Sequence, residues 1–175
     1  MDRFTRRLLL SLLLLSANHA YAERTYVVSP SVGSASISNI NGYRNSPFLR
    51  VDGTFYPIPE FGVGLFVADY SGFNSNVGGS EVGIKVTGGG AGVTGRWPVH
   101  PHAQPYFRVD YMRWNAEATG FGRTLAKDRG GSAGLALGVQ FPIRRMFGVK
   151  AEAAGYNNVS GADIRQLSVG LTLEF

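Results

Sequence analysis

The residues best suited to chemistry occur as charged pairs of opposite sign. These pairs are Arg50 with Asp52, Glu81 with Lys85, Arg108 with Asp110, and Lys150 with Glu152. Residues two or four positions apart in an extended strand lie on the same face, so each pair presents a cation beside an anion. Such groups either form buried ion pairs or act as acids and bases, depending on their surroundings. The chemistry open to them is therefore set by the elements that position them.

Two histidines, His100 and His102, lie in a proline-rich stretch at residues 98–105 that predicts a turn. Two ligands in a turn, with no carboxylate before Asp110, do not make a metal site. The chain also contains no cysteine, which excludes disulfides and thiolate ligands. The sequence therefore predicts neither a metal nor another cofactor.

The elements that carry these residues are predicted to be β-strands, because apolar and polar residues alternate. We expect strands at about residues 25–37, 48–56, 61–68, 81–97, 106–112, 132–141, 147–154 and 166–175. In the last of them Leu167, Val169 and Leu171 share one face. The pattern predicts an all-β fold, a meander of about eight antiparallel strands without a helix.

Irregular features are expected at three places. The apolar phase changes across Gly88, Gly89 and Gly90, which predicts a β-bulge or kink within one strand. Stretches rich in glycine and polar residues, at about 69–80 and 116–131, are predicted to be long loops.

The N-terminus has the order of a secretory signal peptide. Basic residues precede an apolar run from Leu8 to Leu15, and Ala20-Tyr21-Ala22 forms a small-x-small cleavage site. We expect residues 1–22 to be removed, which leaves one domain at 23–175. Loss of Asp2 with three arginines lowers the formal net charge from +5 to +3. No basic run accumulates, so nucleic-acid binding is not expected.

The aromatic residues show which face is exposed. They flank the turns at one end of the sheet, in the apolar phase. These residues are Tyr26, Phe55, Phe61, Trp97, Phe107, Phe141, Phe147 and Phe175. A ring of this kind is typical of the girdle at a membrane interface, here the periplasmic one.

The polar face alternates its charges with glycines such as Gly62, Gly64, Gly134 and Gly138. The narrow interior of a closed eight-stranded barrel needs residues without bulk, whereas a solvated surface does not. We therefore interpret all four charged pairs as a network in the barrel lumen. Two alternatives stay open, a soluble barrel with a solvated charged face, and a periplasmic lipocalin-like carrier with its apolar residues inside.

The chain resembles the small outer-membrane β-barrels of the superfamily that includes the OmpA transmembrane domain, OmpX and the opacity proteins. The resemblance rests on the cleavage site, the hairpins, the paired turn aromatics and the terminal segment at residues 171–175. It implies an eight-stranded antiparallel up-and-down transmembrane barrel in the outer membrane of a Gram-negative cell, and a monomer. It also implies contact with outer-membrane lipid and lipopolysaccharide, and with the barrel-assembly machinery through the C-terminal strand.

Among functions, an enzyme that modifies lipid A is the main catalytic alternative. His100 and His102 are predicted on the periplasmic side, away from the leaflet that holds lipid A, so no enzyme is expected. A wide pore is not expected either, because side chains fill so small a barrel. A structural or surface-interaction role through the outer loops remains, with a host or envelope protein as partner. The candidate contact residues are Tyr43, Arg44, Phe73, Phe121, Arg123, Lys127 and Arg129. The alternative is that their basic groups only meet lipopolysaccharide phosphates.

Overall fold

The computed structural model describes residues 25–38, 42–77, 80–97, 102–121, 123–144 and 146–175. The expected signal peptide, residues 1–22, lies outside them. The strands are β1 (Thr25–Ser38), β2 (Ser46–Ile58), β3 (Phe61–Val77), β4 (Ser80–Arg96), β5 (Gln104–Gly120), β6 (Arg123–Arg144), β7 (Phe147–Val159) and β8 (Ala162–Glu174). Within the described part of the chain, no helix is long and apolar enough to cross a membrane.

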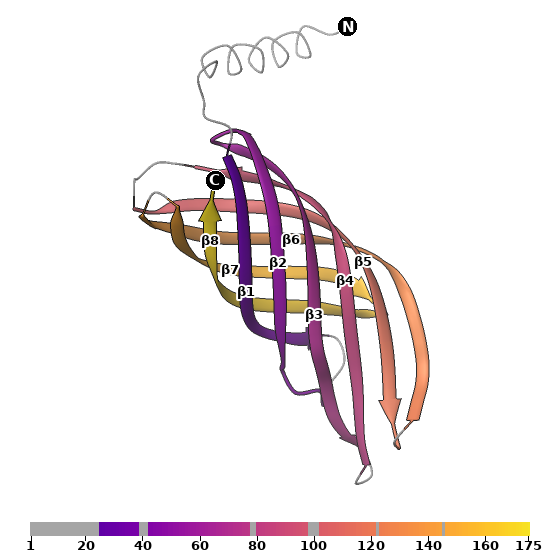
Figure 1. Cartoon of the computed structure of the whole chain (residues 1–175). Coiled ribbons are helices and arrows are strands. Elements are labelled where there is room, and N and C mark those ends of the chain that lie inside the picture. Colours follow the sequence, from indigo (N-terminus) through magenta and orange to yellow (C-terminus); the bar gives the residue numbers. More distant parts are fainter. Residues whose placement is uncertain (1–24, 39–41, 78–79, 98–101, 122, 145) are drawn as a thin grey trace, which may run out of the picture.

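Each strand pairs antiparallel with the next, and β1 pairs with β8 to close the barrel. The predicted all-β, eight-stranded up-and-down barrel is therefore confirmed. The closing register sets Val32 opposite Val169. The N-terminus of β1 and the C-terminus of β8 lie at the same end of the barrel (Figure 1). We call this the terminal end.

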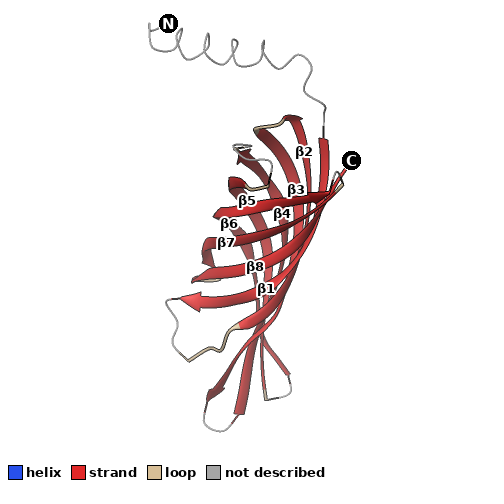
Figure 2. Cartoon of the chain, turned by 90° about the vertical axis from the view of Figure 1, so that its left-hand side faces the viewer, coloured by secondary structure: helices blue, strands red, loops and turns tan. Residues whose placement is uncertain are grey.

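Strands β3 to β6 project beyond the rest of the barrel at the end opposite the termini (Figures 1 and 2). The register explains the projection, since β5 and β6 pair out to Gly120 and Arg123, whereas β6 and β7 pair only from Gly134 and Tyr156. We call the projecting part of these four strands the projecting sheet. The prediction of long loops at 69–80 and 116–131 was wrong, because most of these residues belong to strands β3 to β6.

The irregularity predicted in the glycine run is also absent. Pairing of β4 with β5 is continuous from Val82 to Arg96, so Gly88–Gly90 contain no bulge. These glycines instead allow close approach, since a Cβ at Gly90 would lie 1.9 Å from the carbonyl oxygen of Tyr111. A register shift occurs in β3 between Tyr70 and Phe73, where Gly72 has φ 137°.

The two faces of the barrel differ sharply in polarity. Large apolar side chains face outward, with Leu65, Leu137 and Leu167 more than half exposed at 70%, 61% and 67%. The buried residues include many polar and charged groups, among them Arg50 and Arg108. A water-soluble protein buries such groups only with partners, so the interior contacts explain how this arrangement is stable.

Candidate functional site

Arg50 on β2 lies at the centre of the interior, with 1% of its surface exposed. Its Nε donates to Asp52 Oδ1 at 2.8 Å, and its Nη2 donates to Asp110 Oδ2 at 3.1 Å. Its Nη1 donates to the hydroxyl of Tyr156, which donates in turn to Asp110 Oδ2 at 2.8 Å. The guanidinium carbon also lies 3.7 Å from the centre of the Phe66 ring. One side chain thus joins β2, β3, β5 and β7.

Arg108 and Lys150 complete this buried ion network. Arg108 donates to Asp110 Oδ2 at 3.0 Å and to Glu152 Oε1 at 2.8 Å, and Lys150 Nζ donates to Asp52 Oδ2 at 3.0 Å. Together with Arg50, three cations face three carboxylates, so the buried charges balance. Each of these carboxylates is held by a cation, which stabilises its negative charge inside the barrel.

A second polar cluster, the terminal plug, closes the interior at the terminal end. Arg96 donates through Nη1 to Glu174 Oε1 and through Nε to the carbonyl of Pro59, both at 3.0 Å. Gln140 donates to the same Glu174 oxygen at 2.8 Å, and the Arg96 guanidinium lies 4.3 Å from the Tyr56 ring centre. The plug joins β8 to β4 and β6 across the lumen.

Apolar and aromatic side chains fill the interior toward the projecting sheet. The rings of Phe48 and Tyr70 lie 5.4 Å apart, and those of Tyr70 and Phe73 lie 6.3 Å apart. Trp114 packs in the same cluster and donates to Ser132 Oγ at 2.8 Å. Side chains therefore occupy the lumen at three heights, as expected for a barrel of this strand number.

The outer face of the projecting sheet carries a hollow of about 750 Å³, which we call the basic hollow. Its lining includes Lys85, Thr87, Asn115, Glu117, Lys127 and Arg129. Lys127 Nζ lies 3.6 Å from Glu117 Oε1, which also accepts a 2.7 Å hydrogen bond from the Thr124 hydroxyl. That hydroxyl and the charge of Lys127 lower the pKa of Glu117 from its ordinary value of 4.5. The hollow is thus polar and exposed, and its lining has three cations, Lys85, Lys127 and Arg129, and two carboxylates, Glu117 and Asp128.

The sequence of the chain matches the family described as outer membrane protein beta-barrel domain over residues 8–175. The chain belongs to this family. Its members are outer-membrane barrels, so the outward apolar band is the surface that faces lipid. The outward face of the projecting sheet carries charged residues such as Lys85, Lys127 and Arg129, which belong outside the hydrocarbon layer. No curated protein is similar enough in sequence to count as a match.

Three solved structures share the fold. Neisserial surface protein A is 16% identical, with a TM-score of 0.66 over 86% of this chain and 97% of that one. Ail of Yersinia pestis, in complex with the heparin analogue sucrose octasulfate, is 15% identical, with a TM-score of 0.60 over 87% and 97%. The N-terminal barrel domain of OprF from Pseudomonas aeruginosa is 10% identical, with a TM-score of 0.62 over 85% and 97%. At these identities the likeness shows the fold.

The structure brings together six of the eight predicted lumen charges. Arg50, Asp52, Arg108, Asp110, Lys150 and Glu152 are all buried in the ion network. Lys85 is different, because β4 has no bulge to turn it inward, and its side chain is 54% exposed beside Asp69 at 3.9 Å. Its assignment to the lumen was wrong. The backbone of Glu81 pairs with Asn76, and its side chain lies outside the described residues.

The eight aromatic residues of the predicted girdle all lie near the terminal end on the outward face. Six of them are exposed by 41% or more, namely Tyr26, Phe61, Trp97, Phe141, Phe147 and Phe175. Phe55 and Phe107 are partly covered, because their rings pack on Tyr26 at 4.8 Å and on Trp97 at 5.4 Å.

The predicted loop contacts are divided between surface and core. Arg44, Phe121, Arg123, Lys127 and Arg129 are exposed. Tyr43 is partly buried against the apolar cluster. Phe73 is fully buried, so its prediction as an exposed contact was wrong. The shift at Gly72 turns Phe73 into the interior, where it packs on Tyr70.

Sequence reasoning missed the terminal plug and the aromatic partners of the ion network. Arg96 and Glu174 come from separate strands, and neither has an oppositely charged neighbour two positions away. Tyr106 donates to Glu152 Oε2 at 2.8 Å, and its place in the polar phase was the available signal. The described residues contain no group of three or more His, Cys, Asp or Glu that could hold a metal ion. His102 is exposed near the terminal end, and His100 lies outside the described residues.

Proposed function

We propose that the protein is a non-enzymatic surface-interaction protein of the outer membrane, which contacts a host or envelope protein through the projecting sheet. One observation carries the proposal. Residues 123–131 of β6 are exposed, and they pair with β5, with one register shift at Leu125, but with no other described strand. A strand with one open edge can accept an extended segment from another chain.

The register identifies which backbone groups face this edge. Trp97 N–H donates to the backbone carbonyl of Pro105, so the carbonyl of Pro105 on β5 points toward β4. Because successive residues of a strand point to opposite sides, Ala116 points toward β6, and its partner Asp128 points back toward β5. Lys127 and Arg129 therefore direct their N–H and C=O groups to the open side. Arg129 N–H bonds Asp128 Oδ1 at 2.8 Å, a contact that an incoming strand would replace.

The tip of the projecting sheet supports the same function. Phe121 is 69% exposed and Leu125 is 47% exposed, so the tip offers two apolar side chains on which a partner can pack. Ail and Neisserial surface protein A are similar in fold, and the second is a surface protein by name. Interior side chains at three heights argue against a diffusion pore, and paired carboxylates argue against catalysis.

Export by residues 1–22 and delivery of β8 to the barrel-assembly machinery complete the proposal. Glu174, the last residue of β8, points inward, and Phe175 after it is exposed. Both features agree with a terminal strand that is recognised before the barrel closes.

A proline at the edge tests the proposed contact. Lys127→Pro removes one edge N–H, whereas Lys127→Gln removes the same charge and keeps that N–H. We expect cells that display Lys127→Pro to lose adhesion to host cells, and cells with Lys127→Gln to keep most of it. Heat modifiability on gels checks that both variants fold. Equal adhesion by both variants and the parent would leave the barrel as a membrane component without this contact.

A further inference from the structure

A groove runs along the lipid-facing side of β4. The strand contributes the small residues Gly89 and Ala91 to this face, and the neighbouring strands contribute large ones. Leu65 and Val67 of β3 are 70% and 62% exposed, and Tyr111 of β5 is 56% exposed. The register places Ala91 between Leu65 and Tyr111. The two walls are roughly 10 Å apart, twice the spacing of adjacent strands. We call this feature the β4 groove.

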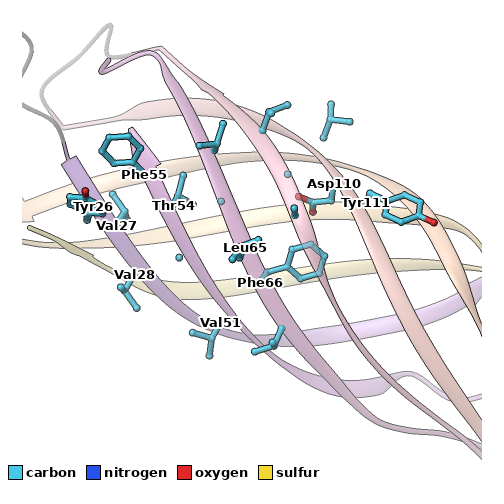
Figure 3. Close-up of a pocket in the computed structure, with 18 of the residues that line it drawn as sticks. Tyr26, Val27, Val28, Val51, Thr54, Phe55, Leu65, Phe66, Asp110 and Tyr111 are labelled. Atoms are coloured by element: carbon cyan, nitrogen blue, oxygen red, sulfur yellow. The ribbon is translucent and has the colours of Figure 1, made fainter. Parts of the chain in front are cut away.

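The β4 groove belongs to a larger apolar hollow on the outward face. Its volume is about 1110 Å³, and its lining includes Val51, Leu65, Val93, Val109 and Tyr111 (Figure 3). The hollow is widened at Gly53, which pairs with Leu65 and where a Cβ would meet nothing within 4 Å. The hollow lies in the apolar band, where lipid chains cover the barrel.

The β4 groove leads directly to the basic hollow. In register across β4, β5 and β6, the successive rows are Ala91, Tyr111 and Ala133, then Gly89, Arg113 and Gly131, then Thr87, Asn115 and Arg129. Each row is about 6.7 Å from the next, so the apolar and basic parts are separated by roughly 13 Å. Tyr111 leans along this path, since a Cβ at Gly131 would lie 2.0 Å from its hydroxyl oxygen.

Cations predominate where this path reaches the projecting sheet. Four basic residues, Lys85, Arg113, Lys127 and Arg129, share the outward face with two carboxylates, Asp69 and Glu117. The two ion pairs there are long, at 3.9 Å and 3.6 Å, and exposed. Pairs of this kind are weak, so a phosphate can replace the carboxylate partners. Arginine binds phosphate with two parallel hydrogen bonds, which suits Arg113 and Arg129 to the task.

We propose that this column of β4, β5 and β6 is a binding site for one membrane lipid with a phosphorylated sugar headgroup, the class to which the lipid A part of lipopolysaccharide belongs. A hydrocarbon chain lies in the β4 groove, beside Leu65 and Tyr111. The phosphate lies against Arg113 and Arg129, and the sugar lies in the basic hollow. The occupant is a membrane lipid and not a soluble anion, because the cations continue into the apolar groove. The inference depends on the outer-membrane location and not on the protein contact proposed for β6.

Native mass spectrometry of the full chain tests the site. The protein is reconstituted in nanodiscs of phosphatidylcholine that contain either diphosphoryl lipid A or phosphatidylglycerol, and bound lipid is counted after release. We expect one retained lipid A per chain and little retained phosphatidylglycerol. Arg113→Gln with Arg129→Gln, and separately Ala91→Leu, are each expected to weaken lipid A retention at least tenfold.

Matched variants at exposed positions elsewhere show whether the loss of lipid A retention is specific to this site or is a general effect of lost charge or added bulk. Arg44→Gln with Arg165→Gln removes the same charge from other exposed positions, and Ala153→Leu adds the same bulk to β7. Both should retain lipid A like the parent, with heat modifiability showing that every variant folds. Equal retention of phosphatidylglycerol, or equal losses in the matched variants, would show a general anionic lipid surface and overturn the proposal. A retained second copy of the chain in place of lipid would overturn it as well.

Discussion

Replacing Arg50 with methionine is expected to destabilise the folded barrel by about 3–5 kcal/mol, the usual cost of removing one partner of a buried ion pair. Arg50 is 1% exposed and bonds Asp52 at 2.8 Å and Asp110 at 3.1 Å. Methionine fills most of the volume without charge. Three interior carboxylates then face only Arg108 and Lys150, so one negative charge stays uncompensated.

The remaining contacts set the lower end of this range. Asp52 keeps Lys150 at 3.0 Å, and Asp110 keeps Arg108 at 3.0 Å, so neither carboxylate is left without a cation. The predicted loss corresponds to a decrease of about a hundredfold to several thousandfold in the folding equilibrium constant. Arg50→Met combined with Asp110→Asn restores the charge balance, and its cost should be smaller than the sum of the two single costs.

Urea titration in phospholipid vesicles, followed by tryptophan fluorescence and heat modifiability, measures the free energy of unfolding. Arg113→Met is the matched control, because this arginine lies on the exposed outward face, and its loss should cost within about 0.5 kcal/mol. A loss below about 1 kcal/mol for Arg50→Met, or strict additivity in the double variant, would refute the reasoning that buried charge balance holds the barrel together.

Two further predictions follow from local geometry. Gly90→Ala should abolish the heat-modifiable folded form, since its Cβ would lie 1.9 Å from the carbonyl oxygen of Tyr111. Gly53→Ala is the control and should fold normally, because its Cβ would meet nothing within 4 Å. A folded Gly90→Ala barrel with unchanged stability would contradict the prediction. NMR titration should place the pKa of Glu117 below 4.5, because the Thr124 hydroxyl and Lys127 favour the carboxylate. Since folding lowers this pKa, Glu117 stabilises the folded protein above pH 4.5. This contribution is lost as the pH falls through the pKa that Glu117 has in the folded protein. Lys127→Gln should raise this pKa, and an unchanged value would show that the lysine has no influence on it.

The alternation of residues was sufficient to predict the strands, because one face of each strand meets a different environment from the other. The closed barrel was predicted from further signals, namely the turn aromatics, the glycines of the polar face and the family resemblance. The prediction of which residues face inward failed where a strand leaves the bilayer, because its outer face then meets water instead of lipid. Val86 faces inward and Ala91 faces outward on one uninterrupted strand, since apolar residues face lipid within the bilayer but pack inside beyond it. The change of apolar face along β4 was interpreted as a bulge, and that bulge would have placed Lys85 in the lumen instead of on the outward face.

Contacts between distant strands were beyond prediction for a different reason. Arg96 and Glu174 lie 78 residues apart in the sequence, and only the barrel's closure brings them to 3.0 Å. The prediction that Phe73 is exposed followed from the loop expected at 69–80. The residue instead lies in β3, where one register shift between Tyr70 and Phe73 turns it inward. Local pairs such as Arg50 with Asp52 were recognisable, because their spacing alone places them on one face.

The terminal plug forms only when the barrel closes. Glu174 on β8 supplies the oxygen that both Arg96 on β4 and Gln140 on β6 bind. Neither residue has this acceptor until β8 has paired with β1 and completed the sheet. Sealing of the terminal end is therefore the same event as closure of the barrel. An intermediate in which β1 and β8 are still apart would be open at that end, which would distinguish it from the finished barrel.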